Sequence, residues 1–219
     1  MALPQAIRRQ KLLLAEGKDE LHFLDELLKI INISGVQIID IGGKDKFRPS
    51  FPTITALSGF RSVVRLGIIR DAEANAAGTL ASVQQSLKEN GLTAPQHSGV
   101  VLTNAVPQIG IWIMPDNRRA GCIEDLCWDG ISEADPRRGC AEMFMGCLGE
   151  SLEKKAGPPG CSASAYYFPK QAAKAKLQAY LAGLHEPQRE LGRAAQAGVW
   201  DLKHSAFTGL RNFLAELFQ

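Results

Sequence analysis

The chain has 219 residues, of which 45% are hydrophobic and 22% are charged, and its formal net charge is +2 at pH 7. These values are ordinary for a globular protein with a full hydrophobic core, and we find no internal repeat or low-complexity segment. So small a net charge does not by itself indicate a nucleic-acid-binding protein.

The sequence also argues against membrane insertion and secretion. No apolar run approaches the roughly 18 residues of a membrane span, and the first residues lack the apolar core of a secretory signal. The five cysteines are odd in number and include no Cys-x2-Cys pair. This spacing argues against a disulfide framework and favours reduced thiols over a zinc site. We therefore expect a cytoplasmic protein without a membrane partner.

Strands and helices alternate in the first 135 residues. Four apolar runs predict strands, at 12–15, 36–41, 63–69 and 108–114. Four helices are predicted between and after them, at 19–31, 51–60, 78–90 and 123–128. Pro52 would lie in the first turn of the second helix, where proline is tolerated. This alternation is typical of an α/β fold, here Toprim-like or Rossmann-like, with a mostly parallel four-stranded sheet flanked by helices.

Beyond about residue 137 the pattern becomes helical. Four further helices are predicted, at 140–155, 170–184, 190–197 and 207–218, and Gly157-Pro158-Pro159-Gly160 separates the first two. We expect an α/β domain over 1–135 and a helical extension over 136–219 that packs on it, with one compact domain as the alternative. The apolar side chains of the last helix could cover the sheet or a second subunit, so a homodimer stays open.

Three groups of carboxylates each follow an apolar run. They are Glu16 with Asp19 and Glu20, Asp71 with Glu73, and Glu124 with Asp125. Because the carboxyl ends of parallel strands open on one edge of a sheet, we expect these groups to meet there. Gathered carboxylates repel one another unless a cation lies among them, and Mg²⁺ (or Mn²⁺) takes oxygen ligands. The pattern therefore indicates metal-assisted phosphate chemistry.

Each carboxylate group has a plainer interpretation. Glu16 could cap the following helix or pair with Lys18, and acids are favourable in a first helical turn. The acids opening the helix at 123–128 could be caps. Asp71 and Glu73 could face water; in an extended strand end, however, their side chains would point the same way, toward one ion.

Basic residues near these acids could contact a phosphate. Lys44 follows Gly42-Gly43, whose backbone could approach an anion. Arg70 could pair with Asp71 or Glu73, but its stronger use would be to bind a phosphate through its planar guanidinium. A stripe of lysines lies in the predicted helix at 170–184, comprising Lys170, Lys174 and Lys176. It is either a solvated face or a phosphate contact.

The series strand–Glu-Gly, strand–Gly-Gly, strand–Asp-x-Glu resembles the Toprim domain. That domain occurs in bacterial primases, type IA and type II topoisomerases, OLD-family nucleases and small maturation ribonucleases. Its proteins hold Mg²⁺ with a Glu after the first strand and an Asp-x-Asp after the third. By this resemblance, which covers roughly residues 10–130, Glu16 matches the first motif and Asp71 with Glu73 the second. Glu73 stands where Asp is usual.

The chain is also similar to a group of uncharacterised bacterial proteins with a stand-alone Toprim-like domain. The shared features are Gly42-Gly43-Lys44, the stretch from Gly110 to Asn117, Glu124-Asp125 and the terminal helix. In OLD-like relatives, an acid four residues after the first one and an acid at a position like Glu124 help to hold a second metal. The resemblance implies that role for Glu20 and Glu124, with Asp125 beside them.

Together these features predict a Mg²⁺-dependent phosphodiester hydrolase acting on DNA or RNA, a nuclease rather than a nucleotidyltransferase. Glu16, Asp71 and Glu73 would hold the ion, while Lys44 or Arg70 would neutralise charge on the phosphate. Tyr166, Tyr167 and Tyr180 all lie in the tail, so a covalent tyrosine intermediate is not expected. The main alternative is a non-catalytic Toprim-like module that binds nucleic acid, a nucleotide or a partner, for example in phage defence. A thiol-based redox or zinc protein is the third alternative.

Overall fold

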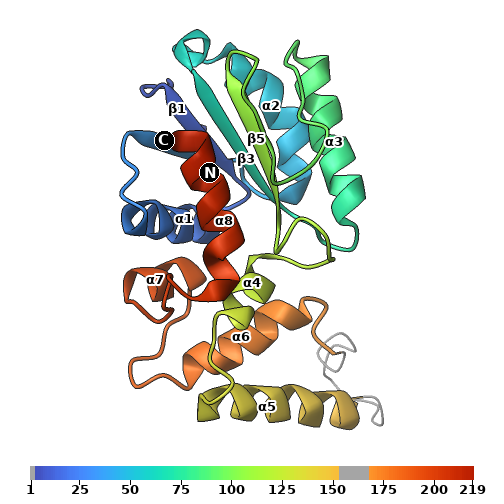
Figure 1. The fold of residues 1–219 in the computed structure, drawn as a ribbon. Coiled ribbons are helices and arrows are strands. Elements are labelled where there is room, and N and C mark those ends of the chain that lie inside the picture. The colour runs from blue at the N-terminus through green and yellow to red at the C-terminus, as the bar shows by residue number, and fades with distance from the viewer. Residues whose placement is uncertain (1–2, 153–167) are drawn as a thin grey trace.

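The computed structural model describes residues 3–152 and 168–219 (Figure 1). Cys161, Tyr166, Tyr167 and the helix breaker at 157–160 lie outside the described residues. Among the helices within these two ranges, none is both long enough and apolar enough to cross a membrane.

A five-stranded sheet forms the centre of the fold, in the order β2-β1-β3-β5-β4. Its parallel strands are β1 (Lys11–Ala15), β2 (Val36–Asp40), β3 (Arg65–Asp71) and β5 (Gln108–Met114). The predicted α/β class with a mostly parallel sheet is therefore confirmed. The fifth strand, β4 (Val101–Leu102), pairs antiparallel with β5 and has only two residues, too few to leave a periodic pattern.

Strand β3 is displaced from its predicted position at 63–69. It begins at Arg65 and continues to Asp71, because its ladder with β5 extends to the pair Asp71–Met114. Asp71 is consequently the last residue of the strand and is held by the sheet on its β5 side. The displacement matters for the site, because a strand residue has a fixed direction relative to the two faces of the sheet.

One face of the sheet is covered by α2 (Phe47–Ala56) and α3 (Ala76–Glu89). Helix α2 begins four residues before its predicted start at 51, directly after a short 3₁₀ turn at Lys44–Lys46. Its buried residues Phe47, Phe51 and Ile54 lie one turn apart and face the sheet. Pro52 is therefore inside the helix and exposed to solvent, and the prediction that it lies in the first turn is wrong.

The other face is covered by α1 (Lys18–Ile30) and the C-terminal helix α8 (Thr208–Phe218) (Figure 1). Helix α8 packs directly on the backbone of the sheet. A Cβ atom at Gly110 would lie 2.8 Å from the Phe213 ring, and one at Gly67 would lie 3.0 Å from Leu217. The apolar side chains of this helix could pack on the sheet or on a second subunit, and the structure shows that they pack on the sheet.

The remaining helices lie beyond one end of the sheet in Figure 1. They are α4 (Ile123–Asp129), α5 (Pro136–Leu152), α6 (Ala172–Ala182) and α7 (Leu191–Gln196). Helix α7 packs closely on α1, since a Cβ at Gly192 would lie 2.7 Å from that of His22. Helices α6 and α7 form a second wall opposite the ends of the parallel strands, and a cleft opens between that wall and the sheet.

Candidate metal centre

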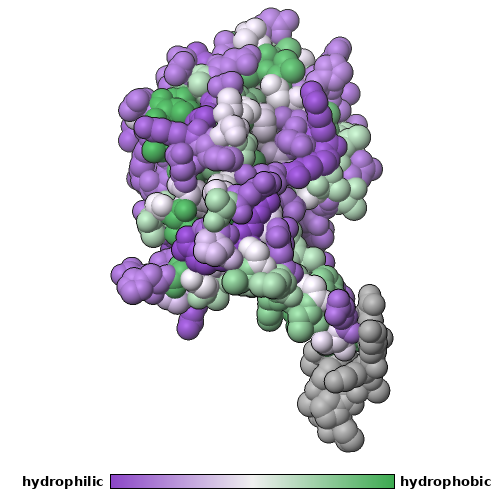
Figure 2. All heavy atoms as spheres, turned by 60° about the horizontal axis from the view of Figure 1, so that its bottom comes forward, coloured by the Kyte–Doolittle hydropathy of each residue, from purple (hydrophilic) through white to green (hydrophobic). Residues whose placement is uncertain are grey.

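A cleft of about 820 Å³ lies at the carboxyl ends of the parallel strands. Its floor is formed by residues that follow β1, β2 and β3 and by the start of α4, and its opposite wall by α6 and α7. In the space-filling view of Figure 2, hydrophilic residues dominate the middle of the surface at this end of the molecule. This is the edge at which ligands of open α/β folds bind.

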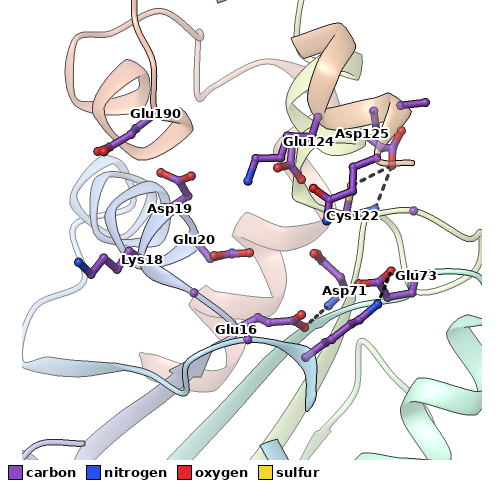
Figure 3. Close-up of a pocket in the computed structure, with 18 of the residues that line it drawn as sticks. Glu16, Lys18, Asp19, Glu20, Asp71, Glu73, Cys122, Glu124, Asp125 and Glu190 are labelled. Carbon is purple, nitrogen blue, oxygen red and sulfur yellow. Dashed lines mark hydrogen bonds and ion pairs between the residues drawn. The ribbon is translucent and has the colours of Figure 1, made fainter. Parts of the chain in front are cut away.

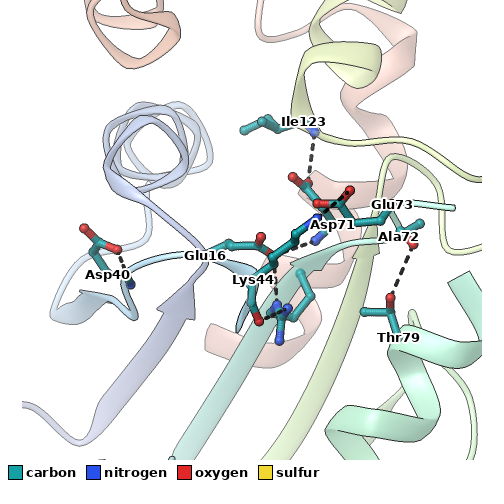
Figure 4. Close-up of polar contacts among 10 residues, drawn as sticks. Glu16, Asp40, Lys44, Asp71, Ala72, Glu73, Thr79 and Ile123 are labelled. Atoms are coloured by element: carbon teal, nitrogen blue, oxygen red, sulfur yellow. Dashed lines mark hydrogen bonds and ion pairs between the residues drawn. The ribbon is translucent and has the colours of Figure 1, made fainter. Parts of the chain in front are cut away.

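Glu16 follows β1 directly and is held by two donors from β3. Its Oε2 atom accepts hydrogen bonds from Arg70 Nε at 2.8 Å and from the Asp71 backbone N–H at 3.3 Å (Figure 4). The prediction that Glu16 and Asp71 converge is thus confirmed. The other oxygen, Oε1, accepts no hydrogen bond within the described part of the chain, and Glu16 lines the cleft.

Arg70 lies on the α2 face of β3, one residue before Asp71. Its guanidinium stacks over the Phe47 ring at 4.9 Å, and its Nη2 donates to the Lys44 carbonyl at 2.9 Å. Arg70 forms an ion pair with an acid, but the partner is Glu16 and not Asp71 or Glu73, the two partners that the sequence suggested. The side chains of this pair are only 8% and 10% exposed, so the contact is buried.

Asp71 points to the other face of the sheet, toward α4. Its Oδ1 atom accepts a hydrogen bond from the Ile123 backbone N–H at 3.0 Å, while Oδ2 accepts none from the described residues. The residue is 8% exposed. Burial raises the pKa of Asp71 well above its usual value, and the charges of Glu16, Glu20 and Glu124 raise it further.

Glu20 and Glu124 complete a group of four carboxylates. Burial, together with the charges of Glu16 and Glu124, raises the pKa of Glu20 to about 7, although a backbone hydrogen bond opposes the shift. Figure 3 shows the side chains of Glu16, Glu20, Asp71 and Glu124 directed toward the space between them. Four separate segments, around β1, α1, β3 and α4, therefore contribute one acid each.

Cys122 belongs to the same centre and was not predicted. Its Sγ atom, a carboxylate oxygen of Asp71 and one of Glu124 all lie within 4.8 Å of one another, close enough for one metal ion to touch all three. The spacing of the cysteines does not reveal this role, because it matches no zinc motif. The nearest signal in the sequence is that Cys122 stands two residues before the candidate ligand Glu124.

Glu73 does not join this group. Its φ of 53° departs from extended geometry, and its backbone pairs with Gly121 through hydrogen bonds of 2.9 and 2.8 Å. The premise of an extended strand end through residue 73, on which the expectation for Glu73 and Asp71 rested, is therefore wrong, because the strand ends at Asp71. The half-exposed Glu73 carboxylate instead lies 3.6 Å from Lys44 Nζ, on the lining of the cleft.

Two other acids serve as local hydrogen-bond acceptors, Asp125 in the predicted role of a helix cap and Asp19 in a contact that was not predicted. Asp125 Oδ2 accepts from the Cys122 backbone N–H at 2.9 Å and from Cys122 Sγ at 3.3 Å, which caps α4. Asp19 Oδ1 accepts from the Gly192 N–H at 3.2 Å and so ties α1 to α7. Both carboxylates contribute negative charge to the lining of the cleft while serving as local hydrogen-bond acceptors.

Basic side chains also line the cleft. They are Lys18, Lys44, Lys170, Lys174 and Arg193. Of the predicted lysine stripe, Lys176 has a different position, with its ammonium 4.1 Å from the centre of the Trp128 ring. The cleft thus combines an acidic floor, which can attract a cation, with basic groups that can attract a phosphate.

Three comparisons with known proteins bear on this chain. The sequence profile of the family described as "Protein of unknown function (DUF3226)" matches residues 10–219. No curated protein matches the sequence. A solved structure of the C-terminal region of the Xanthomonas campestris pv. campestris OLD protein is similar at 14% identity and a TM-score of 0.37, covering 95% of this chain and 97% of that chain.

Proposed function

This chain belongs to the DUF3226 family, and we propose that it is a metal-dependent phosphodiesterase of the nuclease type that acts on nucleic acid. One observation carries the proposal. Glu16, Glu20, Asp71 and Glu124 meet in one cleft, and among the described residues only Arg70 forms an ion pair with any of them. Such a group of like charges is suited to a divalent cation.

The arrangement of the strands supports a Toprim-like assignment within this proposal. Glu16 follows β1, Asp71 ends β3, and these two strands are neighbours in the sheet. This is the order and proximity that the resemblance of the sequence motifs to Toprim domains implies. The extended contact between β3 and β5 then brings the start of α4, with Glu124, to the same edge.

The oxygen atoms that could bind a metal in this centre suit a divalent ion. Asp71 Oδ2 and Glu16 Oε1 receive no hydrogen bond from the residues that the structure describes, although both residues are largely buried. Together with the carboxylates of Glu20 and Glu124, these oxygens match the preference of Mg²⁺ and Mn²⁺. When bound, such an ion polarises a phosphate oxygen and lowers the pKa of an attacking water.

Other residues of the chain have supporting roles in this proposal. Arg70 is a positioning residue, because its guanidinium already holds Glu16 and the Lys44 carbonyl. Lys44 is 55% exposed in its weak pair with Glu73, so its ammonium can move to a phosphate oxygen. Lys170 and Lys174 on the opposite wall would contact the neighbouring phosphates of the strand.

A cleavage assay tests this function. Single-stranded and double-stranded DNA and RNA are incubated with the protein and Mg²⁺ or Mn²⁺, using wild type, Asp71→Asn and Glu16→Gln. We expect cleavage by the wild type only. Asp25→Asn is the matched control, because Asp25 is an exposed acid of α1 outside the cleft. Cleavage that survives both site substitutions, or a wild type that neither binds a divalent ion nor cleaves, contradicts the proposal.

A further inference from the structure

Cys122 brings a sulfur atom into a centre that otherwise offers oxygen. Its Sγ lies within 4.8 Å of the nearest donor oxygens of Asp71 and Glu124, and all three residues line the cleft (Figure 3). Asp71 comes from the end of β3, and Cys122 and Glu124 from the start of α4. Three donors of two chemical kinds are thus within reach of one ion.

Hydrogen bonds hold the possible metal-binding atoms in place. Asp71 Oδ1 accepts from the Ile123 N–H, which ties the strand end to the start of α4. Asp71 is 8% exposed, and its Oδ2 has no donor in the part of the chain that the structure describes. This oxygen belongs to a largely buried side chain that lines the cleft, so it is open to a cation there, independently of the sulfur beside it.

We propose that Cys122 is a ligand of the ion at this centre and gives the site a preference for a thiophilic divalent cation such as Zn²⁺ or Co²⁺ over Mg²⁺. This inference rests on the metal site of the proposed function and specifies its ion. Thiolate is a soft ligand that suits zinc and its neighbours, whereas Mg²⁺ is a hard ion that is bound through oxygen.

Binding of the ion would proceed without any oxidant. The Sγ–H bond of Cys122 breaks, the proton passes to solvent, and the sulfur electron pair forms the bond to the ion. Asp125 Oδ2 loses the hydrogen bond from the thiol and keeps the one from the Cys122 backbone N–H. The cap of α4 therefore survives when the metal binds.

The plainer role for Cys122 is that of a helix cap alone. The substitution Cys122→Ser distinguishes a helix cap from a metal ligand. A serine hydroxyl would preserve the hydrogen bond to Asp125 and most of the side-chain volume, but it is a hard ligand with a poor affinity for thiophilic ions. Cys122→Ser should therefore change the preference between ions and leave the fold intact. Cys122→Ala serves as a second variant, with circular dichroism as the check on folding for both.

The experiment measures binding of Co²⁺ and Mg²⁺ by the full chain. A background with Cys140→Ser, Cys147→Ser and Cys161→Ser is used, which leaves only Cys122 and the buried Cys127 as thiols. Cobalt is followed by its thiolate charge-transfer absorption and both ions by calorimetry. We expect this absorption in the background protein and its loss in Cys122→Ser and Cys122→Ala. The ratio of Co²⁺ to Mg²⁺ affinity should fall by about tenfold or more.

Asp71→Asn separates the two proposals. If it abolishes binding of both ions while Cys122→Ser leaves the cobalt absorption and the affinity ratio unchanged, the role of Cys122 is overturned and the proposed function stands. If the background protein binds neither ion, or Asp71→Asn binds both like the parent, the metal centre itself is overturned.

Discussion

Charged groups are well paired at the amino end of the parallel strands and poorly paired at their carboxyl end. At the amino end, Lys11 of β1 donates to the Phe218 carbonyl, and Arg65 of β3 donates to the Leu217 carbonyl at 2.6 Å. These positive groups meet the negative end of helix α8, which is a favourable arrangement. At the carboxyl end of the same strands four carboxylates gather, and among the described residues only the buried Arg70 forms an ion pair with any of them, through Glu16.

One end of the sheet therefore contributes to stability, while the other end is suited to binding a cation. The charges at the amino end satisfy the last carbonyls of α8 and hold that helix on the sheet. The acids at the carboxyl end repel one another and are partly desolvated, so they destabilise the protein until a cation joins them. We infer that the acids at the carboxyl end serve binding and not stability, so substitutions at the two ends should have different effects.

The largest loss of stability is expected from Arg70→Gln. This change leaves Glu16 as a buried charge without its partner, which costs about 3–5 kcal/mol of unfolding free energy. Urea denaturation measures the loss, and saturating Mg²⁺ should restore part of it by neutralising Glu16. Arg48→Gln is the matched control, because the Arg48–Glu89 pair has the same 2.8 Å distance but is exposed. A loss as small as that of the control would contradict the importance of the buried pair.

Asp71→Asn is expected to separate activity from stability. Nuclease activity should fall by about 100-fold or more, because a proposed metal ligand loses its charge. The metal-free protein should be at least as stable as wild type, since the amide keeps an oxygen for the Ile123 N–H and removes one of the repelling charges. Thermal unfolding in EDTA, alongside the cleavage assay, measures both. A variant that is less stable and still active would show that Asp71 stabilises the fold and is not needed for activity.

The pH dependence of stability should reveal the same repulsion. The pKa of Glu20 is raised from 4.5 to about 7, and that of Asp71 is also raised, so the native state holds protons that the unfolded chain releases. The contribution of Glu20 to the stability of the metal-free protein is therefore fully present below pH 4.5 and is lost as the pH rises through about 7. Melting temperatures in EDTA across this interval measure the trend.

Glu20→Gln should flatten this pH profile, and Asp25→Asn should not. Saturating Mg²⁺ should oppose the trend, because the ion stabilises the ionised carboxylates and competes with protons for them. A metal-free protein whose stability rises between pH 5 and pH 7 would argue that the acids are not in unfavourable contact.

The smallest effect is expected at the amino end. Arg65→Gln removes a charged donor from the end of α8 and should cost about 1 kcal/mol of stability. Because Arg65 lies at the opposite end of β3 from the cleft, the cleavage rate and the affinity for metal should not change. The exposed Arg61 provides the control substitution Arg61→Gln. A change in metal affinity in Arg65→Gln would show that the two ends are coupled.

Much of the fold was predictable from the sequence because burial on both sides of the sheet leaves clear apolar runs. Strand β5 has its predicted bounds for this reason. Strand β3 ends in Arg70 and Asp71, whose charges hide the last two strand residues from an apolar pattern. The start of α2 was missed because Pro52 indicated a first turn, whereas tertiary burial of Phe47 extends the helix backward.

The site was predictable only as far as it depends on the ends of strands. Glu16 and Asp71 could be placed together because neighbouring parallel strands end at one edge. The left-handed conformation of Glu73 depends on its pairing with Gly121, 48 positions later in the chain, and no local pattern reveals that. The position of Cys122 likewise depends on how α4 attaches to Asp71. Long-range contacts therefore decide which of the candidate residues join the group of acids in the cleft.

A crystal of the protein soaked in Mn²⁺ tests the central claim most directly. Anomalous diffraction locates the ion without relying on any assumed activity. We predict one strong peak in the cleft, within coordination distance of Asp71 and Glu124 and bordered by Glu16 and Glu20. Ordered side chains at these four positions with no anomalous peak between them would contradict the account.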